Sequence, residues 1–377
     1  MKKLLLLGAA LCMMTGFSAC SDNGNDGPES NETLSGFYTM NGGNKRGKVP
    51  ASITSYDFET GKATQNAFFA ANDQQVGDGA QMGVIDGDHM YIAMYSSNLI
   101  WDVNASTLKI NSSIVPEGEE VKSPRFLAVK NGKLYATMYT GYVVEYDKAS
   151  GKLLRKVKVG PNPDQFCISG NNLVVACSDG MNSKNGYVNS CISVVDLNKF
   201  TETKIQDLKK LLNPTDAASN GTDAFVVCKG DYSKIPSTVV KVEETKEGIV
   251  ATEVCKGTNI AVCGNELYVI DAPYSKPVNH SAFSFKVYDV KSLKLIRENM
   301  VEQTEGTDSW IASPNGLNVD PATGDIVIVS YNLDSAGASM TQGMTYANVY
   351  DKTGKFKNRV ECGVGARYIV FRHKTIE

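Results

Sequence analysis

Short runs of apolar and β-branched residues, separated by polar turns, follow one another along this chain. The clearest example is the stretch 123–160, in which Tyr, Val, Leu and Thr crowd four such runs. They predict strands over residues 125–129, 134–138, 143–146 and 153–159. Asn131-Gly132 predicts a tight hairpin turn after the first strand, because both residues tolerate positive φ, and Ser150-Gly151 predicts another.

The same unit recurs through the whole chain. Its first strand is found seven times, over residues 81–85, 125–129, 164–168, 215–219, 259–263, 315–319 and 367–371. The third strand often ends in an aspartate, at Asp57, Asp102, Asp147, Asp196, Asp289 and Asp351. Because this aspartate repeats with the unit, we interpret it as a turn former rather than a catalytic group. Repeats of roughly forty to fifty residues with four strands each are typical of a β-propeller.

Seven first strands predict an all-β fold with seven blades. The last copy, residues 367–371, has no partner strands after it, while residues 36–40 and 52–58 lack a first strand before them. We therefore expect the C-terminal strand to complete the N-terminal blade, which closes the ring and removes an exposed sheet edge. A β-helix is the alternative fold, but its repeats are far shorter. Two separate β-domains are disfavoured because the repeat continues without interruption along the chain.

The N-terminus resembles a bacterial lipoprotein signal. Lys2-Lys3 precede a short apolar segment over residues 4–14, and Phe17-Ser18-Ala19 lead into Cys20. We expect residues 1–19 to be a signal peptide, Cys20 to be lipidated, residues 20–35 to be a disordered tether and residues 36–377 to be the propeller. The alternative is a simple secretory peptide cut near Ala19.

Seven further cysteines remain, and an odd number cannot all pair within one chain. Cys167, Cys177 and Cys191 fall in three strands of one repeat, which would allow a cross-strand disulfide. The favoured interpretation is that most cysteines are small buried hydrophobes. No C-x-x-C pair occurs, so zinc and redox motifs of that type are absent.

The composition argues against several functions. A net charge of −3 disfavours nucleic acid as a partner, since phosphate binding needs a basic surface. Only three histidines occur, and His280 is the one candidate contact among them. No G-x-S-x-G elbow or complete phosphate-binding glycine motif is present. We therefore predict no catalytic residues, no metal site and no cofactor.

Loop lengths separate the two rims of the predicted propeller. Turns between strands one and two, and between three and four, are short and uniform. The loops of the other rim are long and varied, over residues 41–51, 70–80, 178–190, 229–237, 271–282, 303–313 and 330–347. Long loops on a rigid scaffold are where binding residues collect, so this rim is the predicted binding face.

Aromatic side chains are interleaved with Asn, Gln and Ser on the long-loop rim, a mixture that suits a broad polar ligand with apolar faces. The aromatic candidates for ligand binding are Tyr95, Tyr139, Tyr142, Tyr187, Tyr232, Tyr274, Trp310 and Tyr331. Arg125 and Arg367 open first strands near the central channel, where they would meet a phosphate or pair with neighbouring carboxylates.

Several stretches, among them GFYTMNGGN, VGDGAQMGVIDGDHMYIAM and SPRFLAVKNGKLYATMYTGYVVEYDKASGK, resemble the YncE-like surface lipoprotein propellers of gut bacteria. The resemblance covers residue 36 to the end. It implies seven blades and, for the BtuG-like branch, capture of cobalamin and its transfer to a TonB-dependent transporter. The family's early N-E-G-N motif is Asn41-Gly42-Gly43-Asn44 here, so its acidic residue is missing.

The expected function is therefore non-enzymatic capture of cobalamin or a related corrinoid on the outer-membrane surface, with the lipid anchor as the sole membrane contact. The alternatives are another ligand, such as a siderophore, haem or a glycan, or a propeller lyase or lactonase. A third is an adhesion or assembly module that docks a membrane protein.

Overall fold

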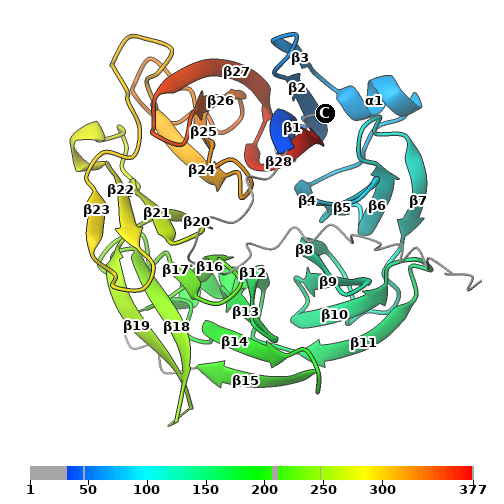
Figure 1. Ribbon diagram of the computed structural model, residues 1–377. Helices are drawn as coiled ribbons and strands as arrows, with labels where there is room; N and C mark the ends of the chain where they lie inside the picture. Colours follow the sequence, from blue (N-terminus) through cyan, green and yellow to red (C-terminus); the bar gives the residue numbers. More distant parts are fainter. Residues whose placement is uncertain (1–31, 46, 206–210, 247, 376–377) are drawn as a thin grey trace, which may run out of the picture.

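The chain forms seven four-stranded antiparallel sheets arranged as blades in a ring (Figure 1). The computed structural model describes residues 32–45, 47–205, 211–246 and 248–375. The predicted signal peptide, Cys20 and most of the predicted tether lie outside the described residues. The expected all-β, seven-bladed fold is confirmed.

The blades follow one another along the sequence, and each runs from an inner to an outer strand. The N-terminal blade comprises β28 (Ala366–Thr375), β1 (Glu32–Asn41), β2 (Ser52–Asp57) and β3 (Lys62–Thr64). The next two comprise β4 (Ala80–Asp86), β5 (His89–Met94), β6 (Leu99–Asn104) and β7 (Ile110–Ile114), then β8 (Pro124–Lys130), β9 (Lys133–Met138), β10 (Tyr142–Asp147) and β11 (Leu153–Lys158).

The remaining four blades repeat this order. The strands are β12 (Pro163–Ser169), β13 (Asn172–Cys177), β14 (Cys191–Asp196) and β15 (Thr201–Ile205), then β16 (Pro214–Ser219), β17 (Ala224–Cys228), β18 (Thr238–Thr245) and β19 (Gly248–Lys256). The last two blades are β20 (Asn259–Cys263), β21 (Glu266–Asp271), β22 (Ser284–Asp289) and β23 (Leu295–Arg297), then β24 (Ser313–Val319), β25 (Ile326–Tyr331), β26 (Met344–Tyr350) and β27 (Phe356–Val364).

The two ends of the described chain pair with each other, as predicted. β28 runs antiparallel to β1 from Glu32↔Thr375 to Asn41↔Ala366. Figure 1 shows the blue and red strands side by side in one blade. Because β28 is long enough to pair with Glu32, strand structure begins four residues before the expected boundary at Gly36.

The core consists of apolar layers between neighbouring blades. One layer joins Val174 and Val194 of one blade to Val226 and Val240 of the next, all of them buried. Both faces of the middle strands are therefore covered, which explains why β17 (Ala224–Cys228) is apolar throughout and fully buried. The inner strands contact one another in succession around the channel.

Five of the repeated aspartates are turn formers, as predicted. Each carboxylate accepts a hydrogen bond from the backbone N–H two or three residues further along the chain, at Asp57, Asp147, Asp196, Asp289 and Asp351. Asp102 is the exception, because its carboxylate lies 2.8 Å from Nδ1 of His89. In that blade Asn104 forms the turn, accepting the N–H groups of Ser106 and Thr107.

Short helices occur only in the long connections of the described chain. α1 (Ala67–Asn72), which the sequence pattern did not predict, packs Phe68 against Trp101. The 3₁₀ helices η1 (Gly180–Asn185) and η2 (His280–Ala282) lie in two loops of the long-loop rim. Within the described ranges, none of these helices has the length and hydropathy to cross a membrane.

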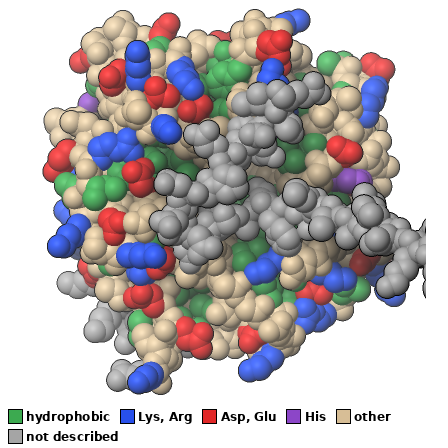
Figure 2. Space-filling model, viewed as in Figure 1, with side chains coloured by type: hydrophobic (Ala, Val, Ile, Leu, Met, Phe, Trp, Pro, Cys, Tyr) green, Lys and Arg blue, Asp and Glu red, His purple; other side chains and the backbone are tan. Residues whose placement is uncertain are grey.

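Basic and acidic side chains are interspersed around the visible face of the ring (Figure 2). This mixture matches the small net charge of −3. Attraction of a ligand therefore depends on local groups rather than on the field of the whole molecule.

Candidate binding site at the channel mouth

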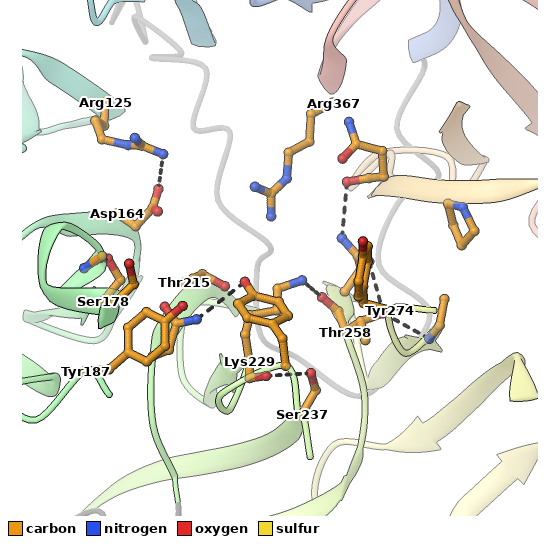
Figure 3. Close-up of a pocket in the computed structure, with 18 of the residues that line it drawn as sticks. Arg125, Asp164, Ser178, Tyr187, Thr215, Lys229, Ser237, Thr258, Tyr274 and Arg367 are labelled. Carbon is orange, nitrogen blue, oxygen red and sulfur yellow. Dashed lines mark hydrogen bonds and ion pairs between the residues drawn. The ribbon is translucent and has the colours of Figure 1, made fainter. Parts of the chain in front are cut away.

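A cavity of about 480 Å³ opens at the mouth of the central channel, on the rim that carries the long loops. Its walls come from the starts of inner strands β8, β12, β16, β20, β24 and β28 and from the loops after β9, β13, β17 and β21. Figure 3 shows side chains from these elements converging on one opening. This volume lies within the range of small-molecule sites.

Bulges at the starts of the inner strands direct side chains into this cavity. The pairing register shifts at Arg125, Asp164, Thr215, Asn315 and Arg367, and all five line the cavity. A bulge leaves its extra residue out of the ladder and turns its side chain aside. In four of the five strands a proline precedes the bulged residue. Proline has no backbone N–H, and a sheet tolerates this at the first residue of a strand or next to a bulge.

Charged groups form the floor of the cavity. Arg125 Nη2 lies 2.7 Å from Asp164 Oδ1, and Arg367 pairs with Asp216 from a strand 151 residues earlier. Lys229 Nζ lies 3.6 Å from Asp216 Oδ2 and also donates to the carbonyl of Thr258. Three cations and two carboxylates are therefore paired in the floor, and the Asp271 carboxyl also interacts with Lys229.

Burial perturbs these charges. It lowers the pKa of Lys229, although the Asp216 carboxylate opposes the shift. It raises the pKa of Asp164, although the Arg125 guanidinium opposes that shift. Among the described residues, Thr215 Oγ1 and the Nε atoms of Arg125 and Arg367 are buried without a hydrogen-bond partner. The floor is thus poorly solvated and incompletely satisfied, a setting that favours a ligand with negative charge.

Tyrosines surround the charged floor. Tyr139, Tyr187, Tyr232 and Tyr274 line the cavity, and Tyr232 and Tyr274 are 54% and 75% exposed. Tyr187 and Tyr232 both have φ of 58°, a left-handed backbone that is costly for a bulky residue. Such strain persists only where the surroundings impose it and is concentrated at ligand sites. The exposed rings offer flat apolar faces at the entrance.

The structure brings six of the ten predicted ligand residues together in the cavity. These six are Arg125, Tyr139, Tyr187, Tyr232, Tyr274 and Arg367. Tyr95 stands behind them, with its ring 5.4 Å from that of Tyr139 and under the Arg125 guanidinium. Tyr331 does not line the cavity, but it is close enough for Arg367 to influence its pKa.

The other two predicted residues lie elsewhere. The Tyr142 hydroxyl donates to Glu120 Oε1 at 3.1 Å, beneath the ammonium group of Lys156. The Trp310 ring lies 4.8 Å from the His280 ring with their planes inclined at 44°, and the Trp310 carbonyl accepts a hydrogen bond from Tyr346. The candidate contact His280 is held in this cluster and does not line the cavity.

Sequence reasoning missed most of the polar residues of the floor, namely Asp164, Thr215, Asp216, Lys229 and Asn315. A signal for three of them was present, since Asp164, Thr215 and Asn315 each follow the proline that opens a first strand, as Arg125 does. Lys229 opens the long loop 229–237 of the predicted binding face, whereas no such signal marked Asp216.

A second hollow lies away from the channel mouth. A hollow of about 430 Å³ on the opposite rim, between the blades of β12 and β16, is lined by valines such as Val174 and by polar and acidic residues such as Glu243 and Glu244. It lacks the aromatic rings and paired cations of the channel mouth. Over the described ranges, no three His, Cys, Asp or Glu residues are grouped to hold a metal ion.

No protein-family model and no curated protein sequence matches the chain. Among solved structures, a chain of "Kuenenia stuttgartiensis Hydrazine Synthase" is similar, with a TM-score of 0.55 and 17% identity. The match covers 76% of this chain and 87% of that chain. At this identity the likeness shows the fold alone. Since 1378 solved chains match, the architecture by itself selects no function. The chain is a seven-bladed β-propeller similar in structure to the propeller of that protein.

Proposed function

We propose that this protein is a lipid-anchored surface receptor that captures a small-molecule nutrient, foremost cobalamin or a related corrinoid, and passes it to a TonB-dependent outer-membrane transporter. The observation that carries the proposal is the cavity at the channel mouth, where exposed tyrosines surround a floor with three cations and with arginine Nε donors that lack a partner. Surface location and transfer rest on the lipoprotein-like N-terminus and on the resemblance stated above.

A corrinoid offers complementary chemistry. Its nucleotide loop carries a phosphodiester, which Lys229 and the two arginines would bind by charge-assisted hydrogen bonds. Its ring and base have flat apolar faces for Tyr232 and Tyr274. Its amide side chains would pair with amide groups such as those of Asn213 and Asn315. The cavity is smaller than a whole corrinoid, so it would hold the nucleotide lobe while the ring lies over the rim.

Equilibrium titration of the full chain with cyanocobalamin tests the proposal, with binding expected at micromolar concentration or below. Tyr274→Ala removes an exposed ring that lines the cavity, so it should weaken binding about two- to tenfold without affecting folding. Tyr142→Ala is the matched control, because this tyrosine lies outside the cavity, and binding should be unchanged.

Absence of binding at micromolar concentration would sink the corrinoid version and direct the search to siderophores, haem and glycans. If Tyr142→Ala loses binding while Tyr274→Ala binds as the parent does, the ligand site would lie away from the channel mouth. Capture of a TonB-dependent transporter regardless of ligand would favour a docking module.

The second candidate function is a propeller lyase or lactonase. The observation in its favour is Asp164, a buried carboxyl in the cavity whose pKa is raised by burial. However, Asp164 Oδ1 lies 2.7 Å from Arg125, and a purely structural ion pair would have the same geometry. Stoichiometric calcium or zinc in the purified protein would favour the enzyme.

A further inference from the structure

Two cysteines stand at the two ends of one cavity loop. Cys177 is the last residue of β13, and Cys191 is the first residue of β14. The loop between them, residues 178–190, contributes Ser178, Gly180, Ser183 and Tyr187 to the cavity wall. A covalent link between these cysteines would tie the base of this loop.

The strand pairing brings the two cysteines face to face. Cys177 and Cys191 are directly opposite in the antiparallel ladder of β13 and β14. Opposite residues in such ladders have Cα atoms about 4.5 or 5.5 Å apart. A disulfide needs Cα atoms about 4.4–6.8 Å apart, and the Cα separation of either type of pair lies in this range.

The side chains occupy a shared space as well. Ser193 Oγ lies 3.6 Å from Cys177 Sγ and 3.8 Å from Cys191 Sγ. Both sulfurs pack against Gly160, where a Cβ would lie 3.0 Å from Cys177 Sγ and would overlap Cys191 Sγ. The missing side chain of Gly160 is therefore what makes room for the two sulfurs together.

The third cysteine of this blade is excluded by its position. Cys167 packs with Val174 and Ala176 in the apolar layer on one side of the sheet. Cys177 and Cys191 pack with Val175 in the layer on the other side. Only one pairing within the blade is therefore geometrically available.

We propose that Cys177 and Cys191 are a modification site, at which an external disulfide oxidises the two thiols to a disulfide that clamps the base of the 178–190 loop. The thiolate of one cysteine attacks the oxidant's disulfide and releases one thiol. The second cysteine then attacks the mixed disulfide and releases the other thiol. The two protein thiols lose two protons and two electrons, and the oxidant is reduced to two thiols.

The two thiols differ in their surroundings. The hydrogen bond from Cys177 lowers the pKa of Cys191, whereas burial raises the pKa of Cys177. Because both side chains are buried, the oxidant reaches them while the blade is folding or during local opening.

Peptide mapping of the full chain, refolded with oxidised and reduced glutathione and then alkylated, tests this proposal without any ligand. Trypsin cleaves after Lys158, Lys184 and Lys199, so the disulfide should join peptides 159–184 and 185–199 with the loss of two hydrogen atoms in mass. Quantitative alkylation of both Cys177 and Cys191 would overturn it.

Two variants identify the partners. Cys167→Ser keeps the linked peptides, since Cys167 faces the other layer, and Cys191→Ser abolishes them. Linked peptides that vanish in Cys167→Ser would contradict the assignment. In the oxidised chain, amide hydrogen exchange over residues 178–190 should quicken on reduction with dithiothreitol, and no such change should occur in Cys191→Ser. Equal exchange before and after reduction would contradict the clamp.

Discussion

Individual residues in this protein have one of two roles: they form turns of the scaffold or they line the candidate site. Aspartates at the ends of third strands shape turns by accepting backbone N–H groups, and they recur because the turn recurs. Residues in the inner-strand bulges do not repeat in type: Arg125, Asp164 and Thr215 occupy equivalent places in successive blades. A residue type that recurs in every blade therefore indicates a structural role, whereas a residue type that varies at an equivalent position indicates the candidate site.

Asp147 offers a test of the turn role. Hydrogen bonds from the Ser150 hydroxyl and Lys133 hold the pKa of Asp147 at about 2, below an unfolded value of about 3.9. Because the folded pKa is the lower one, the contribution to stability is complete above about pH 4 and is lost as pH falls towards 2. Asp147→Asn should lower the Tm at neutral pH, and the difference from the parent should shrink below roughly pH 4.

Thermal unfolding monitored by circular dichroism across this pH range provides the measurement. Glu117→Gln, at an exposed position in a loop, is the control and should leave the Tm unchanged. A deficit in Asp147→Asn that persists undiminished in acid would argue against the carboxylate as the stabilising group.

At the scale of elements, the inner strands combine scaffold and site. Each forms the first strand of a blade, and bulges such as those at the starts of β12 and β24 turn Asp164 and Asn315 towards the channel. Neighbouring inner strands must also approach closely. Gly316 in β24 shows this, since a Cβ there would overlap the carbonyl oxygen of Arg367 in β28.

Gly316→Ala should therefore destabilise the fold by about 1–3 kcal/mol, the usual cost of forcing extra volume into a packed position. It should also displace Arg367 and weaken ligand binding. Gly42→Ala is the matched control, because its nearest contact would be 3.4 Å away, and its effect should stay within about 0.5 kcal/mol. Urea unfolding of both variants gives the free energies, and equal values would refute the close-approach argument.

At the scale of the whole molecule, the ring depends on the pairing of its two ends. β28 is the only strand of the N-terminal blade that comes from the C-terminal end of the described chain. Arg372 strengthens the pairing, since its Nη2 donates to the carbonyl of Tyr56 at 2.7 Å and its guanidinium lies over the Tyr38 ring. Without β28, β1 and β24 would both lose a neighbour, and the sheet edge would be exposed.

A chain that stops at Gly365 should therefore aggregate or fail to give a single cooperative unfolding transition. A circular permutant that begins at Ala366 and joins Thr375 to Glu32 by a short turn should fold normally, because these two residues are already paired. Size-exclusion chromatography and circular dichroism distinguish the outcomes. A monomeric truncated chain with the parent's Tm would show that closure is dispensable.

Much of the architecture was readable from local patterns. Strand runs, turn dipeptides and the incomplete last repeat predicted the seven first strands and the closure of the ring, because these depend on neighbouring residues and on counting. α1 was missed, since it is short and carries no repeated pattern. The start of β1 at Glu32 was missed because only the partner strand β28 holds those residues in a sheet.

The candidate site depended on tertiary structure to a greater degree. Tyr139 and Tyr142 lie three residues apart and looked equivalent, yet only Tyr139 reaches the cavity, because Tyr142 belongs to the next strand of the blade. Arg367 meets Asp216 across 151 residues of sequence. Residue types and spacing predicted the blades and the rim with the long loops. Which side chains meet at the channel mouth was decided only when the ring closed, since contacts between distant blades have no signature in local sequence.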